Sequence, residues 1–283
     1  MIYILGMSHA INVLKALSIA ELSFSHENWV GLSTGGQFFD VHTKPGLISG
    51  DLLKAFIVSP ACGWGGQTAQ LHTLPDGKQT VVGAEGFISL LLSLESDQDN
   101  SCLFSFTYGN EHSVLSMVQH PEPYDFCLPW RADFPMEPDC QPIPYEVVRR
   151  QMELALSSTI GSLVMARIKL PRMRLVHVLP PPPVASNEQI LRSPEIFRDQ
   201  FAQYGITPIS IRVKYYLLFI EVLRLALDPY RVELLESPKQ ATNESGALKD
   251  EYAFAATHAN EAYGNLVAQQ FKVHLQSRES SVI

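Results

Sequence analysis

The stretch that decides the fold is residues 2–17, which read IYILGMSHAINVLKAL. The apolar run Ile2–Leu5 ends at Gly6, and apolar residues at helical spacing follow from Asn12 to Leu17. This pattern predicts a strand, a tight turn and a helix, with Ser8 at the turn.

The same alternation continues along the chain. Apolar and aromatic runs predict further buried strands at Cys102–Thr107, Arg174–Leu179 and Tyr230–Leu235. Helical spacing predicts helices at Gly86–Leu94, Tyr145–Ala166, Pro208–Leu227 and Asn260–Phe271. Because parallel neighbours need crossover connections, this order predicts a three-layer α/β/α fold with a mostly parallel central sheet. The segment Leu22–Asp76 gives no clear order of elements.

The length of 283 residues, 46% of them apolar, permits a large core, and we expect one domain over residues 1–283. Seven prolines lie between Pro121 and Pro144, where they fix φ and remove backbone donors. This segment, residues 121–144, is expected to be an irregular excursion over the surface, as a lid or a partner-binding loop.

Composition argues against several classes of protein. A net charge of -8 argues against a general nucleic-acid binder, because phosphates are neutralised by a surplus of Lys and Arg. No apolar run reaches the roughly 18 residues of a membrane span, and the N-terminus lacks the basic region of a signal peptide. We expect a cytoplasmic protein whose four cysteines, without CxxC or metal-ligand spacing, stay reduced.

Polar residues follow the predicted strands at the edge where functional groups gather in α/β sheets. The first strand leads to Ser8 and His9, the Cys102 strand leads to Gly109-Asn110-Glu111-His112, and the Tyr230 strand precedes the segment containing His258. A hydroxyl nucleophile needs a base and donors for the oxyanion that forms on a carbonyl. Ser8, His258 and Asn110 are the residue types that supply these parts.

These segments resemble the motifs of the SGNH, or GDSL-like, hydrolase superfamily, in the branch whose opening motif reads G-x-S-H. That family has a serine after the first strand, a G-x-N motif after a central strand and D-x-x-H near the C-terminus. The resemblance spans nearly the whole chain and implies a flavodoxin-like architecture. It also implies that Ser8 attacks, that His258 accepts its proton, and that the Ser8 N–H and the Asn110 side chain bind the oxyanion.

The chain departs from the family pattern at two positions. Ala255 occupies the aspartate position of D-x-x-H, so the carboxylate that orients His258 is missing there. Three alternatives follow: Ser8 and His258 act as a dyad, Asp250 or Glu251 substitutes from the same loop, or the protein is inactive. Met7 stands where the GDS signature has aspartate. The oxyanion-hole glycine of the family has four candidates, namely Gly63, Gly65, Gly66 and Gly83.

Structural interpretations stand beside the catalytic ones. Ser8 is a preferred N-cap residue, His258 fits a residue packed under Tyr263, and Asn110 fits a turn. His9, Glu111 and His112 are candidate substrate contacts, although a structural histidine explains His9 and His112 equally well. No metal-ligand spacing joins the histidines, and we expect neither a metal nor a cofactor.

The sequence therefore predicts a serine esterase that removes an acyl group from a sugar or small-metabolite ester through an acyl-Ser8 intermediate. The first alternative is an acyltransferase of the same fold, in which a sugar hydroxyl replaces water. The second is a binding protein that has lost turnover together with the acid missing at Ala255. Under all three hypotheses the protein binds a small-molecule or carbohydrate ester, and the sequence does not indicate an oligomeric state.

Overall fold

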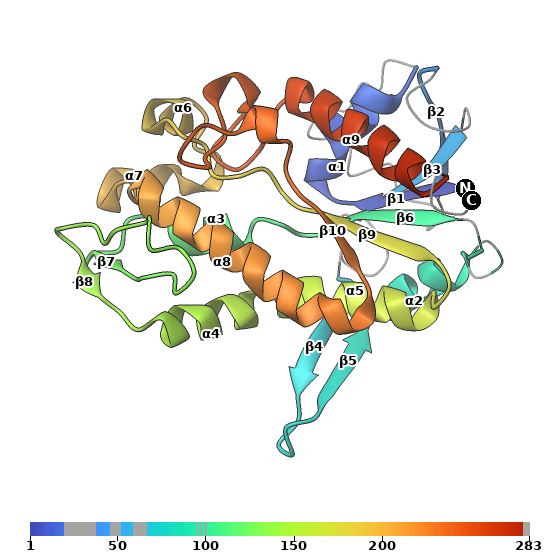
Figure 1. The fold of residues 1–283 in the computed structure, drawn as a ribbon, viewed down its shortest axis with the longest axis horizontal. Coiled ribbons are helices and arrows are strands. Elements are labelled where there is room, and N and C mark those ends of the chain that lie inside the picture. Colours follow the sequence, from blue (N-terminus) through green and yellow to red (C-terminus); the bar gives the residue numbers. More distant parts are fainter. Residues whose placement is uncertain are drawn as a thin grey trace.

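A six-stranded sheet forms the centre of the protein (Figure 1). The structure is a computed structural model and describes residues 1–19, 38–45, 52–58, 67–94, 96, 98–99 and 101–279. The sheet strands are β1 (Ile2–Gly6), β2 (Phe39–His42), β3 (Leu52–Ile57), β6 (Cys102–Phe106), β9 (Arg174–Val178) and β10 (Glu233–Leu235). They lie in the order β10-β9-β6-β1-β3-β2, and all neighbours are parallel except β2 and β3.

The order of the parallel strands confirms the predicted flavodoxin-like α/β fold. Numbered along the chain, β1, β3, β6, β9 and β10 stand in the order 2-1-3-4-5, which is the flavodoxin-like arrangement. The winding reverses between β1 and β6, and ligands of such sheets bind beyond the carboxyl ends of the strands at this point. Ser8 follows β1 and Asn110 follows β6, so both lie next to this crevice.

The helices cover both faces of the sheet (Figure 1). They are α1 (Ser8–Leu17), α2 (Glu85–Leu92), α3 (Glu111–Ser116), α4 (Tyr145–Ala155), α5 (Ser157–Lys169), α6 (Asn187–Arg192), α7 (Arg198–Tyr204), α8 (Ile209–Leu227) and α9 (Glu261–Glu279). A hairpin of β4 (Ala69–Thr73) and β5 (Gln79–Gly83) packs against α5. Within the residues described above, no helix is both long and apolar enough to cross a membrane.

Alternating side chains of β1 build the two cores. Ile2 and Ile4 pack on the face covered by α1 and α9, whereas Tyr3 and Leu5 pack on the face covered by α2, α5 and α8. A strand that is buried on both faces is apolar at every position, as in a parallel sheet between two helical layers. The apolar run Ile2–Leu5 therefore reflects the three-layer arrangement.

Most predicted elements are present with shifted ends, and one is wrong. The helix expected from Tyr145 to Ala166 is two helices, α4 and α5, separated at Leu156. The backbone N–H of Leu156 still bonds Met152 and its C=O still accepts from Ile160, so the chain bends there without losing the hydrogen-bond ladder. The bend allows α4 to pack on α8 while α5 packs on the β4–β5 hairpin and α2.

The proline-rich segment, residues 121–144, has little regular structure and is fixed to the core. It contains only the two-residue strands β7 (Tyr124–Asp125) and β8 (Gln141–Pro142). Asp125 and Lys214 of α8 form an ion pair of 2.6 Å in which both side chains have no exposed area. Phe126 is also fully buried. The segment is therefore part of the packed core at Asp125 and Phe126, and it is not a freely moving lid there.

Candidate active site

Ser8 is held close to the end of β1 because the connection between β1 and α1 is very short. A Cβ atom on Gly6 would lie 2.4 Å from Cβ of Ala10, so only glycine allows the helix to start this close to the strand. Ser8 is the first helical residue and Met7 is the N-cap, without a side-chain cap bond. The interpretation of Ser8 as a helix cap is therefore wrong. Its backbone N–H, in the first turn, has no acceptor within the helix.

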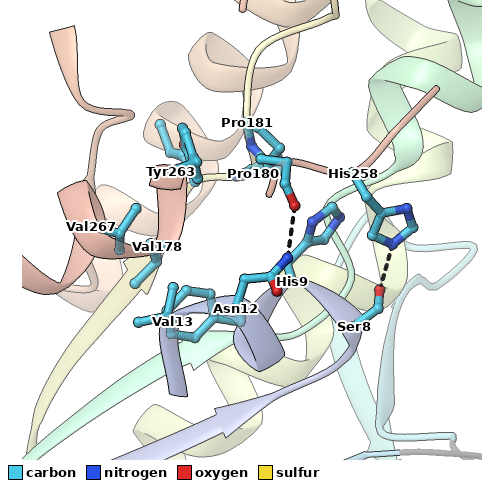
Figure 2. A pocket seen from close by; sticks show the side chains of 14 residues that line it. Ser8, His9, Asn12, Val13, Val178, Pro180, Pro181, His258, Tyr263 and Val267 are labelled. Carbon is cyan, nitrogen blue, oxygen red and sulfur yellow. Dashed lines mark hydrogen bonds between the residues drawn. The ribbon is translucent and has the colours of Figure 1, made fainter. Parts of the chain in front are cut away.

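The hydroxyl of Ser8 meets His258 although the two residues are 250 positions apart. His258 Nε2 lies 2.9 Å from Ser8 Oγ, and Figure 2 shows the two side chains pointing toward each other. The loop before α9 that carries His258 is tied to α1, since the Asn12 side chain donates to the Ala259 carbonyl at 2.7 Å. This contact places the imidazole over the start of α1.

The second ring nitrogen of His258 contacts a carboxylate that the sequence analysis missed. Glu195 Oε1 lies 2.5 Å from His258 Nδ1, and Glu195 Oε2 accepts from the N–H and the hydroxyl of Thr257 at 2.7 and 2.8 Å. Glu195 begins the short 3-10 turn Glu195–Phe197 between α6 and α7. Ser8, His258 and Glu195 thus have the connectivity of a serine, histidine and acid triad.

The environment keeps Glu195 ionised. Burial opposes its ionisation, but the hydrogen bonds from His258 and Thr257 and the attraction of His258 outweigh burial and lower the pKa of Glu195 below its ordinary value. The two carboxylates considered as substitutes for the missing acid do not fill this place. Asp250 and Glu251 are exposed, and Nδ1 of His258 is already held by Glu195. The carboxylate at this ring nitrogen comes from a different loop.

Unusual backbone angles occur on both sides of the site. Glu195 has a φ of 53° and Tyr108 has a φ of 61°, values that L residues adopt rarely. Gly109 follows with a φ of 114°, and a Cβ atom there would lie 3.1 Å from Pro180. Such conformations cluster at functional sites, where the surrounding structure enforces them. Here they place the Glu195 carboxylate and the Asn110 side chain.

Asn110 and His9 are joined by a hydrogen bond. His9 Nε2 lies 2.7 Å from Asn110 Oδ1, and the ring of His9 stacks on that of His258 with 4.9 Å between centroids and 24° between planes. Burial, followed by the charge of His258, lowers the pKa of His9 to about 3. His9 is therefore neutral at physiological pH and contacts both His258 and Asn110.

The other two candidate contacts are placed differently. Glu111 lies beside Ser8 and Asn110, but its carboxylate already accepts from the Gly109 N–H at 2.9 Å and from the hydroxyl of Thr159. Burial raises the pKa of Glu111 despite these bonds. His112 is only 2% exposed and packs against Tyr216 and Phe219, so its ring belongs to the core and substrate contact by His112 is not supported.

The structure places Met7 and one of the four candidates for the oxyanion-hole glycine. Met7, at the aspartate position of the GDS signature, accepts the Tyr108 N–H on its sulfur at 3.4 Å and so supports the loop before Asn110. Among the glycine candidates, Gly63, Gly65 and Gly66 lie outside the described residues. Gly83 lies at the end of β5 and borders a separate hollow beside the β4–β5 hairpin.

A pocket of about 400 Å³ opens beside Ser8. This volume falls in the range of small-molecule sites. The wall combines polar and apolar side chains. Its lining residues are Met7, Ser8, His9, Tyr108, Asn110, Glu111, Val114, Leu115, Ala155 and Ser158. A second, much smaller cavity lies behind the rings of His9 and His258, between α1, α9 and the end of β9 (Figure 2).

The sequence did not indicate Glu195, because no local motif identifies it. It lies 63 positions before His258, inside a segment with no short spacing to the other site residues. One general rule points toward it, since the chain reaches the 3-10 turn after leaving the carboxyl end of β9, on the same edge as Ser8 and Asn110.

No protein-family model and no curated protein matches this chain. Among solved structures it is similar to the periplasmic domain of a lipopolysaccharide acetyltransferase from Salmonella Paratyphi A, at 9% identity over 98% of this chain and 82% of that chain, with a TM-score of 0.44. It is also similar to a putative arylesterase from Agrobacterium tumefaciens (12% identity, 98% of both chains, TM-score 0.36). A third similar structure is Est24, a carbohydrate acetylesterase from Sinorhizobium meliloti (11% identity, 98% of both chains, TM-score 0.37).

Proposed function

We propose that the protein is a serine esterase that cleaves an acyl ester of a sugar or small metabolite through an acyl-Ser8 intermediate. The observation that carries this proposal is the row of contacts from Ser8 Oγ to His258 Nε2 at 2.9 Å and from His258 Nδ1 to Glu195 at 2.5 Å. A histidine bonded on one side to a carboxylate and on the other to a serine hydroxyl is arranged for nucleophilic catalysis.

In the first half-reaction, Ser8 Oγ bonds to the carbonyl carbon of the ester while its proton passes to His258 Nε2. The Ser8 N–H and the Asn110 side-chain amide donate to the oxyanion that forms, and Glu195 offsets the charge of the imidazolium. The tetrahedral intermediate then breaks its bond to the leaving oxygen. That oxygen takes the proton from His258, and the alcohol departs.

In the second half-reaction, water takes the place of the alcohol. His258 Nε2 removes a proton from the water as the water oxygen bonds to the acyl carbon, and the same donors hold the second oxyanion. The bond to Ser8 Oγ then breaks, Ser8 regains its proton from His258, and the carboxylic acid leaves. An alcohol acceptor in place of water would give acyl transfer by the same residues.

The contact between Glu195 and His258 removes the reason to favour a binding protein without turnover. That alternative depended on the missing carboxylate at Ala255, whereas Glu195 supplies a carboxylate to the same ring nitrogen. The pocket beside Ser8 has room for an acyl group together with part of the alcohol. These steps need no metal or cofactor.

Hydrolysis of p-nitrophenyl acetate and butyrate, followed with and without sugar acceptors, tests the proposal. We expect turnover by the wild-type protein and a loss of several orders of magnitude in Ser8→Ala and His258→Ala. Acylated sugar among the products would identify a transferase. Equal hydrolysis by the wild-type protein and Ser8→Ala would contradict the proposal.

We also propose that the protein acts in the cytoplasm. Cys127 and Cys140 are free thiols. Free thiols persist in reducing compartments. Fractionation of the native host cells with an antibody against the protein tests this location, and recovery outside the cytoplasmic fraction would contradict it.

A further inference from the structure

The ring of His9 touches two parts of the proposed esterase site at once. One face stacks on His258, with 4.9 Å between the ring centroids. Its Nε2 atom lies 2.7 Å from Oδ1 of Asn110. His9 immediately follows Ser8 in the first turn of α1, so the nucleophile and this ring are placed by the same backbone.

The chemistry of the amide fixes the direction of the bond between His9 and Asn110. A carboxamide oxygen can only accept, so His9 Nε2 carries the proton and donates it. Asn110 then has its oxygen occupied and its NH₂ group left as the donor for the pocket that it lines together with Ser8. An asparagine whose amide is free to turn would present the carbonyl oxygen, which repels an oxyanion, for part of the time.

The charge state of His9 suits its contact with the base. Burial, followed by the charge of the neighbouring His258, lowers the pKa of His9 to about 3. A neutral ring can stack on the imidazolium that forms on His258 without repelling it. A second cation at this place would oppose the proton transfer from Ser8.

We infer that His9 is a positioning residue, which orients the Asn110 amide as the oxyanion donor and supports the ring of His258. The inference rests on the proposed esterase function. It replaces the expectation that His9 binds substrate with a role exerted through Asn110 and His258. A positioning role predicts a loss in kcat with little change in KM, because Asn110 strengthens its bond to the substrate oxygen only as negative charge develops.

Two substitutions separate the contributions of the ring and the donor. His9→Phe keeps an aromatic ring against His258 but cannot donate to Asn110, whereas His9→Gln keeps a donor but has no ring. Loss of one oxyanion-hole donor typically lowers kcat about 10²–10³-fold, so we expect His9→Phe to lose roughly tenfold to a hundredfold and His9→Gln to recover part of that loss. His72→Phe, at an exposed position of the β4–β5 hairpin, is the matched control.

A double-mutant cycle with Asn110→Ala identifies the path of the effect. If His9 acts through Asn110, Asn110→Ala lowers kcat much less in the His9→Phe background than in the wild-type protein. A merely structural role would give independent losses. Thermal unfolding of each variant shows that it is folded, and His9→Leu replaces His9→Phe if the latter does not fold.

The outcomes separate this inference from the proposed function. A kcat of His9→Phe within about twofold of the wild-type value, or fully additive losses in the cycle, would overturn the role of His9 while leaving the esterase intact. If the wild-type protein shows no turnover that is lost in Ser8→Ala, the proposed function is overturned, and the role of His9 with it. Coupled losses with partial rescue by His9→Gln are the result expected.

Discussion

The carboxylate of Glu195 lies 2.5 Å from Nδ1 of His258, on the opposite side of the ring from the Ser8 hydroxyl. Ser8 is the first residue of α1, Glu195 lies in a 3-10 turn between α6 and α7, and His258 lies in the loop before α9. The carboxylate that contacts His258 therefore comes from a segment distant in sequence from Ala255.

Glu195→Gln is expected to lower kcat by roughly two to four orders of magnitude, because the comparable loss of a triad carboxylate costs about 10⁴. The amide cannot offset the charge of the imidazolium, and its NH₂ group favours the wrong tautomer of His258. KM should change little. Steady-state hydrolysis of an aryl ester measures both constants.

Carboxylates near His258 in sequence provide the control for Glu195. Asp250→Asn and Glu251→Gln change exposed side chains in the loop before α9 and should leave kcat within about twofold of the wild-type value. A larger loss in either variant than in Glu195→Gln would show that the acid has been assigned to the wrong residue.

The sequence was sufficient to predict those parts of the site that follow from local rules. Ser8 and Asn110 follow apolar strands at a chain reversal, and the parallel order brings their strand ends to one edge. Glu195 could not be found in this way, since its place depends on how the chain runs after β9. The packing of His112 between Tyr216 and Phe219 is likewise a result of tertiary contact, and its sequence position beside Asn110 was misleading.

Gly6→Ala should destabilise the fold by about 1–3 kcal/mol, as overpacking of a core typically does. The new methyl group would lie 2.4 Å from Cβ of Ala10 and would push α1, with Ser8, away from β1. Chemical denaturation measures the loss. In the double variant Gly6→Ala/Ala10→Gly the clashing methyl is gone, so this variant should be more stable than Gly6→Ala alone. The reverse order of stability would contradict the packing argument.

Lys214→Met should destabilise the protein by about 3–5 kcal/mol, because it leaves the buried Asp125 carboxylate without its cation. Lys214 also donates to the Pro135 carbonyl, and Asp125 accepts from the Glu137 N–H, so the proline-rich segment should loosen at the same time. Urea denaturation and limited proteolysis within residues 121–144 test both effects. Additivity of Lys214→Met and Asp125→Asn in the double variant would argue against the pair.

The free energy of unfolding should decrease as the pH is lowered from about 6.5 to about 4, because His177 is buried in β9. Burial lowers its pKa from 6.5 to about 4, so in this range the unfolded chain binds more protons than the folded protein. Stability is therefore gained as the pH rises through this window. His177→Gln should flatten the dependence of the urea midpoint on pH, whereas exposed His72→Gln should not. An unchanged slope in His177→Gln would contradict this account.

The most direct test of the proposal that Ser8 is the nucleophile is its covalent reaction with an aryl fluorophosphonate, followed by intact mass and peptide mapping. We predict one adduct per chain, located on Ser8, that is absent in Ser8→Ala and forms far more slowly in His258→Ala and Glu195→Gln. An adduct on another residue, or labelling that is as fast in His258→Ala as in the wild-type protein, would contradict the assignment of this site.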